Sequence, residues 1–105
     1  MESSRSFSDA FGHTIELTPE RWFHVLAEHQ ELEAFDHLIP ETLQAPDDVV
    51  RSIYDPKVGL YYKWFPSLWH GKYFVVVVQF NRHHFILTAY ITDKIKGGVR
   101  LWPSG

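Results

Sequence analysis

The fold of this chain is decided by two apolar runs, YFVVVVQF at residues 73–80 and HFILTAYI at residues 84–91, which a short polar turn joins. The first run is apolar on both strand faces, which predicts a central strand that is covered on both sides. The second run alternates. Because strand side chains change faces at every residue, Thr88 and Tyr90 are expected to share one face with Ile86. That face is the first place to look for function.

The composition is that of one globular domain. The chain has 105 residues, of which 45% are apolar and 16% aromatic, so it can bury most of a two-layer core. The absence of cysteines excludes disulfides, thiolate nucleophiles and cysteine-built zinc sites. The formal net charge of −3 counts against broad nonspecific binding to a polyanion, although a small local basic site is compatible with it.

The sequence shows no targeting signal. The N-terminal residues lack the apolar segment of a signal peptide, and no run of residues approaches the ~20 apolar positions needed to span a bilayer. We therefore expect a cytoplasmic protein with no membrane partner.

A flexible segment is expected at the N-terminus, before the folded domain. Residues 1–10 are polar and serine-rich and are predicted to be a flexible lead, followed by a single domain over residues 11–105. Residues 11–17 are expected to form a short strand. Thr18 and Pro19 then predict a helix start, because the threonine hydroxyl can cap the helix and proline suits its first position.

Two helices are predicted before the main strands. The first has an apolar stripe at helical spacing and runs to about residue 29. The second covers residues 32–43 and contains Pro40, which removes one backbone hydrogen bond. That helix should therefore kink at Pro40 or begin near Asp36.

The rest of the chain is predicted to be a sheet. Strands are expected at residues 49–54, 60–64, 73–80 and 84–91, with a further edge strand at residues 99–102. Short connections favour antiparallel order. The expected fold class is α+β, with two N-terminal helices packed on an antiparallel meander of about four strands.

The candidate site combines hydroxyl groups and cations. Thr88 and Tyr90 lie two residues apart, and depending on strand register four further side chains could reach their surface: Arg51, Tyr61, Lys63 and Lys72. Hydroxyl donors and cations suit the stabilisation of a developing phosphorane charge. On spacing alone, Thr88 and Tyr90 fit ordinary strand-forming positions on a half-solvated sheet better than a site.

Histidine is the natural acid or base for such chemistry. The chain has seven histidines, but none has a partner at a recognised metal-ligand spacing, so no metal or other cofactor is predicted. His24 is preferred as acid or base because it lies off the apolar stripe of its helix. His29 lies on that stripe and is expected to be half-buried.

Aromatic side chains support an alternative function. Trp64 and Trp69 flank a loop and could form a surface for a partner, since aromatic residues with little charge are typical of interface cores. The alternative to an enzyme is therefore a noncatalytic binding or assembly module that forms a homodimer.

Several segments together resemble a known group of nucleases. The matching segments are TPERWFHVLAEH at residues 18–29, PDDVVRS at 46–52, YYK at 61–63, GKYFVVVV at 71–78 and LTAYITD at 87–93. Over roughly residues 14–102 the layout resembles small bacterial and phage-associated proteins of the barnase, EndoU, colicin-nuclease and RelE-like superfamily, including relatives of toxin–antitoxin ribonucleases such as BrnT.

The resemblance implies a RelE- or barnase-like fold and a metal-independent endoribonuclease of toxin type. In such an enzyme the RNA 2′-hydroxyl attacks the adjacent phosphate and leaves a cyclic phosphate. By position, the resemblance assigns His24 as acid or base, Arg51 and Lys63 as phosphate ligands, and Thr88 and Tyr90 as groups that position the reactants. The implied partners are RNA and an antitoxin protein. The low Lys and Arg content differs from that of the better-known toxins and counts against ribosome-dependent cleavage.

Overall fold

The computed structural model describes residues 3–103, in which seven strands form one mixed sheet. The strands are β1 (Arg5–Ser8), β2 (Thr14–Leu17), β3 (Asp48–Arg51), β4 (Val58–Phe65), β5 (Lys72–Gln79), β6 (His84–Thr92) and β7 (Val99–Trp102). Between β2 and β3 lie α1 (Pro19–Glu28), the 3₁₀ helix η1 (Gln30–Phe35) and α2 (Leu38–Gln44). None of the helices in residues 3–103 is long and apolar enough to cross a membrane.

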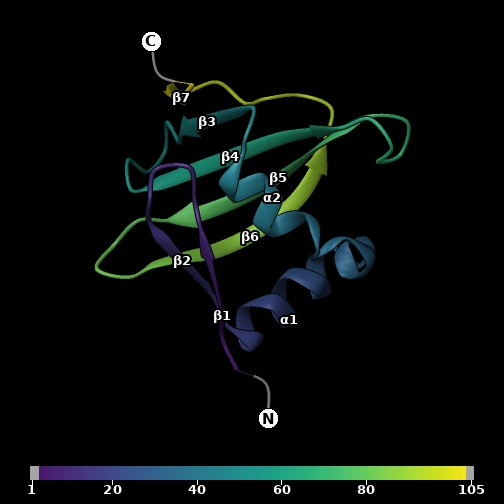
Figure 1. Cartoon of the computed structure of the whole chain (residues 1–105), viewed down its shortest axis with the longest axis horizontal. Helices are drawn as coiled ribbons and strands as arrows, with labels where there is room; N and C mark the ends of the chain where they lie inside the picture. The colour runs from purple at the N-terminus through teal and green to yellow at the C-terminus, as the bar shows by residue number, and fades with distance from the viewer. Residues whose placement is uncertain (1–2, 104–105) are drawn as a thin grey trace.

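The sheet has the strand order β1-β2-β6-β5-β4-β3-β7. All neighbouring strands are antiparallel except β2 and β6, which run parallel. The prediction that residues 73–80 form the central strand is confirmed by the position of β5, and the predicted edge strand at residues 99–102 is confirmed by β7. Figure 1 shows α2 crossing in front of the middle of the sheet and α1 lying on its β6 side.

The helices cover one face of the sheet and build the larger core there. Val25, Leu32 and Leu43 from the helical segment pack with strand residues such as Phe74 and Val76, all nearly or fully buried. Burial of each large apolar side chain contributes about 1.5–3 kcal/mol, so this layer provides most of the stability. A smaller apolar cluster occupies the opposite face of the sheet, and no helix within residues 3–103 covers it.

The predicted start of the first helix is confirmed. The Thr18 side chain accepts a hydrogen bond from the Arg21 amide at 3.1 Å, and Pro19 occupies the first helical position. The predicted second helix is divided into η1 and α2, so the alternative with a start near Asp36 describes it better. Pro40 then lies in the first turn of α2, where a missing amide hydrogen removes no intrahelical bond.

The predicted fold class is wrong. The helices are not N-terminal, because the hairpin of β1 and β2 precedes them, and the sheet is a mixed seven-stranded one rather than an antiparallel meander of about four strands. Two features escaped the sequence patterns. The strand Arg5–Ser8 is too short to show the alternation of a strand. It lies inside the segment expected to be a flexible lead, and it pairs with β2. The parallel pairing of Ile15 with His84 joins residues far apart in the chain.

The expected boundaries also extend beyond the described residues. Residues 1–2 of the predicted lead and residues 104–105 of the predicted domain lie outside the part of the chain that the structure describes.

A bulge in β6 changes the faces of its side chains. Val77 pairs with Thr88 but Val78 pairs with Ile86, so Leu87 is an extra residue. Ile86 is therefore buried on the helix-covered side, and the expectation that it shares a face with Thr88 is wrong. Strict alternation predicts faces only where pairing is regular.

Candidate functional site

The sheet face away from the helices carries several hydroxyl groups. We call it the helix-free face and define it by Leu60, Tyr62, Tyr73, Val75, Val77, Thr88 and Tyr90. The strand register places Tyr62, Val75 and Tyr90 in one row across β4, β5 and β6. Thr88 and Tyr90 therefore lie on the same face of β6, as the sequence predicted.

Tyr90 carries the most unusual polar group on this face. Its hydroxyl oxygen is buried and has no hydrogen-bond partner among the described residues. Burial raises the pKa of the Tyr90 phenol, and the neighbouring Tyr62 phenol raises it further, although no hydrogen bond joins the two side chains. At neutral pH Tyr90 is therefore a neutral phenol with a free O–H donor. A buried group of this kind is rare unless a bound water or a ligand completes its bonding.

His29 lies at the edge of the same row. Its ring centroid is 6.3 Å from that of Tyr90, and its side chain is 32% exposed, which leaves the imidazole open to proton exchange with solvent. The helix end positions it: His29 is the C-terminal cap of α1, and its amide donates to the Val25 carbonyl at 2.7 Å. The Glu31 carboxylate lies 3.7 Å from the imidazole Nδ1.

Lys96 brings a cation to Tyr90 from the loop between β6 and β7. Its ammonium group lies 5.7 Å from the centre of the Tyr90 ring. The backbone fixes this loop over the sheet, because the Lys96 amide donates to the Tyr62 hydroxyl at 3.1 Å. Gly98 permits the close approach of the loop to β3, since a Cβ there would lie 2.3 Å from the Arg51 carbonyl oxygen.

Thr88 adds a second available hydroxyl. Its Oγ1 lies 3.5 Å from the Ala89 carbonyl oxygen, which is at the outer limit of a hydrogen bond. A ligand on the helix-free face could therefore accept a hydrogen bond from Thr88 at little cost.

The preferred histidine of the sequence analysis lies elsewhere. His24 is exposed on α1, and the aromatic ring next to it is that of Phe23, with centroids 6.4 Å apart. The structure thus brings His29, and not His24, to Tyr90.

The four expected substrate-binding side chains lie on the other side of the sheet. By register Arg51, Tyr61, Lys63 and Lys72 all belong to the helix-covered face. The Lys63 ammonium donates to the Ala45 carbonyl at 2.7 Å, and the Lys72 ammonium lies 2.5 Å from the Asp93 carboxylate. These residues are not brought together with Thr88 and Tyr90, because face membership depends on the pairing register.

Three residues of this site were missed by sequence reasoning. Tyr62 stands beside Tyr61, and the sequence does not say which of the two faces away from the helices. Lys96 precedes a glycine pair in a turn, a position that is typical of a solvated charge. His29 shows a signal in retrospect, since it ends the helix and follows its apolar stripe.

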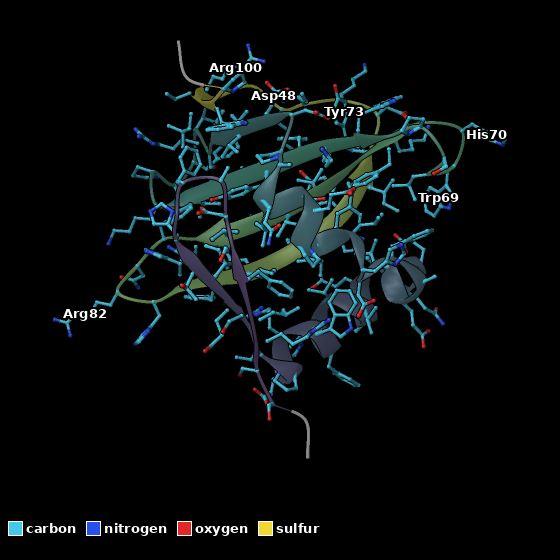
Figure 2. The ribbon with its side chains drawn as sticks, viewed as in Figure 1. Asp48, Trp69, His70, Tyr73, Arg82 and Arg100 are labelled. Carbon is cyan, nitrogen blue, oxygen red and sulfur yellow. The ribbon has the colours of Figure 1, made fainter. Side chains whose placement is uncertain are left out.

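The two loop tryptophans do not form one surface. Trp64 packs edge-on against Tyr73, with ring centroids 5.0 Å apart, whereas Trp69 packs against Phe35 of η1. Figure 2 shows Trp69 and His70 at the far end of the connection between β4 and β5. The side chains of Trp64 and Trp69 remain 42% and 47% exposed.

A second polar cluster lies at the tip of the β1–β2 hairpin. We call Asp9, His13 and Tyr61 the Asp9 cluster. The Asp9 carboxylate is fully buried and accepts hydrogen bonds from the His13 imidazole at 2.9 Å, from the Tyr61 hydroxyl and from the amides of Phe11 and His13. Burial raises the pKa of Asp9, but the bonds from Tyr61 and His13 outweigh it and lower the pKa below its usual value. The cluster anchors the hairpin turn to the sheet.

Histidine pairs in this region do not make a metal site. The rings of His13 and His84 lie 4.8 Å apart, and the buried His84 Nδ1 has no hydrogen-bond partner in the part of the chain that the structure describes. Within residues 3–103, no group of three or more His, Asp or Glu side chains could hold a metal ion.

Comparison of the chain with protein-family models, with curated proteins and with solved structures finds no match.

Proposed function

We propose that this protein is a metal-independent endoribonuclease that cleaves RNA on the helix-free face. One observation carries the proposal: the buried Tyr90 hydroxyl, without a partner among the described residues, lies on a face where His29 and Lys96 both approach its ring. Thr88 adds a hydroxyl on the same strand face. An acid or base, a cation and hydroxyl donors are groups that favour phosphodiester cleavage.

The proposed roles follow from these groups. The RNA 2′-hydroxyl oxygen bonds to the adjacent phosphorus while the bond from phosphorus to the 5′-oxygen breaks, which leaves a cyclic phosphate and a free 5′-hydroxyl. His29 takes the proton from the 2′-hydroxyl, and the imidazolium so formed, or water, supplies a proton to the leaving oxygen. The Lys96 ammonium and the hydroxyls of Thr88 and Tyr90 stabilise the negative charge on the pentacoordinate phosphate. The Tyr90 hydroxyl is buried in the free protein, so RNA binding has to expose it.

The test is incubation of the purified protein with labelled mixed-sequence RNA in excess EDTA. We expect cleavage products that end in a cyclic phosphate. Tyr90→Phe removes one hydroxyl and should lower the cleavage rate about 100-fold, because a positioned donor to the transition state has an effect of this size. His29→Gln should cause a loss of similar size, which is typical of a general acid or base.

His24→Gln is the matched control, because the resemblance assigns this role to His24 while the geometry assigns it to His29. Unchanged cleavage in His24→Gln with loss in His29→Gln would support the site on the helix-free face. The reverse result would remove His29 from the proposal. Absence of any cleavage by the folded wild-type protein would contradict the enzyme itself.

A noncatalytic binding or assembly module is the second candidate. The observation in its favour is the exposure of large apolar side chains, with Phe23 at 73% and Ile53 at 67%. Exposed apolar residues of this size mark a partner surface where they form one contiguous patch. A stable homodimer in sedimentation experiments, together with absence of RNA cleavage, would favour this function.

A further inference from the structure

A cleft of about 300 Å³ adjoins the proposed site. It is lined by Ser52, Ile53, Tyr54, Leu60, Lys96 and Gly97. Leu60 belongs to the helix-free face and is aligned through Val77 with Thr88. Lys96 belongs to both the cleft and the proposed site, because it lines the cleft and its ammonium lies 5.7 Å from the centre of the Tyr90 ring. A molecule in the cleft would therefore be next to the cation of the site.

One wall of the cleft is an aromatic ring that the fold leaves almost fully in water. Tyr54 is 90% exposed, more than any other large hydrophobic side chain described. The turn that carries it is closed by hydrogen bonds: the Tyr54 amide donates to Ser52 Oγ at 3.1 Å, and the Ser52 amide donates to the Val58 carbonyl at 2.9 Å. Tyr54 is thus presented by an ordered turn without contributing to the core.

We propose that this cleft is a base-binding subsite for single-stranded RNA. The base next to the cleaved phosphate lies over Leu60 and stacks on Tyr54, while Lys96 contacts the phosphate between the cleft and Tyr90. The inference rests on the proposed function, since it assigns the substrate of the same site. The protein supplies an apolar floor, an exposed aromatic face and one cation, which is the combination that binds unpaired nucleotides.

The size and chemistry of the cleft select the occupant. Its volume is at the lower end of the range for small-ligand pockets, which suits one planar group. A base paired in a duplex has both faces stacked on its neighbours and cannot present one to Tyr54. The subsite therefore favours single strands over duplexes.

The test measures RNA binding by fluorescence anisotropy in the Tyr90→Phe background, where cleavage is expected to be about 100-fold slower, and within a time too short for that residual cleavage. We expect Tyr54→Ala to weaken binding of a labelled mixed-sequence single strand of eight nucleotides about tenfold, the usual effect of losing one stacked base. Tyr54→Phe should retain the affinity, because it keeps the aromatic ring. A duplex of the same length should bind more weakly than the single strand.

Phe23→Ala is the matched control, since Phe23 is also a highly exposed aromatic residue but lies on α1 and does not line the cleft. Equal affinity of the Tyr54→Ala and Phe23→Ala variants would overturn the subsite. So would equal binding of single strand and duplex, or a homodimer that Tyr54→Ala disrupts while RNA binding stays unchanged.

The two proposals fail separately. If the wild-type protein binds single strands through Tyr54 but cleaves no RNA, the subsite stands and the enzyme function falls. If it cleaves RNA and Tyr54→Ala binds as tightly as the parent, the enzyme function stands and the subsite falls.

Discussion

Tyr61 and Tyr90 lie in the same sheet but on opposite faces, and their hydroxyl groups have opposite surroundings. Tyr61 donates to the buried Asp9 carboxylate, whereas the Tyr90 hydroxyl has no partner among the described residues. Burial raises the pKa of both phenols. Burial alone therefore does not mark a functional tyrosine. A satisfied hydroxyl stabilises the fold, while an unsatisfied one keeps its bonding capacity for a ligand.

The Tyr61 hydroxyl depends on Asp9 as its hydrogen-bond acceptor. Asp9→Ala removes the acceptor of two side-chain donors and two backbone amides, and we expect it to lower the free energy of unfolding by about 3 kcal/mol, because buried donors lose their partners. Urea denaturation at neutral pH measures this loss. Asp55→Ala is the control, since Asp55 accepts one amide bond from Lys57 in an exposed turn. Similar losses in both variants would contradict the special role of the Asp9 cluster.

Tyr61→Phe should have a smaller effect than loss of Asp9. It removes one hydroxyl donor from a carboxylate that keeps its other bonds, so a decrease of about 1–2 kcal/mol in the free energy of unfolding is expected. In a double-mutant cycle with Asp9→Asn the two losses should not add, because both changes remove the same hydrogen bond. Additive losses would show that the Tyr61 hydroxyl stabilises the fold independently of its bond to Asp9.

Acid should weaken the Asp9 cluster in a defined direction. The pKa of Asp9 is lower in the folded protein than its usual value. Its contribution to stability is therefore complete above the unfolded pKa of about 3.9 and is lost as the pH falls through the lower folded value. Urea denaturation at neutral pH and below pH 4 should show a larger loss for the wild type than for Asp9→Asn. An equal loss would mean that other carboxyl groups account for the acid sensitivity.

Tyr90→Phe should have the smallest effect on stability. The change deletes a buried hydroxyl that lacks a partner among the described residues, so the free energy of unfolding should stay within about 0.5 kcal/mol or rise slightly. Thermal and urea denaturation of Tyr90→Phe and Tyr61→Phe under the same conditions measure this difference. A loss as large as that of Tyr61→Phe would show that the Tyr90 hydroxyl has a structural role, and the comparison between the two tyrosines would fail.

The sequence was most informative where physical signals are local. The cap by Thr18 and the central apolar strand were read correctly, because each depends on neighbouring residues or on a continuous run. The short strand expected at residues 11–17 contains β2, but β1 and its pairing with β2 were missed, because a four-residue strand is stabilised by pairing and not by its own pattern. Nuclease chemistry, an antitoxin partner and a cytoplasmic location stay predictions that solution experiments must test.

The residues of the candidate site were likewise predictable only where the signal is local. Alternation placed Thr88 and Tyr90 on one face, because that part of β6 pairs regularly. Whether the expected cations lie beside them depends on how β3, β4, β5 and β6 pair. That pairing register assigns Arg51 and Lys63 to the helix-covered face. His29 and Lys96 reach Tyr90 instead, from a helix end and a loop.

The buried central strand, the capped first helix and the two hydroxyl side chains on one strand face therefore follow from the sequence alone. Only the tertiary structure decided the parallel pairing of β2 with β6, the bulge at Leu87 and the partners of each buried hydroxyl. The reason is physical. Burial and capping follow from short-range chemistry, whereas the choice of pairing and partner depends on which distant segments compete for the same sheet edge and the same hydrogen bond.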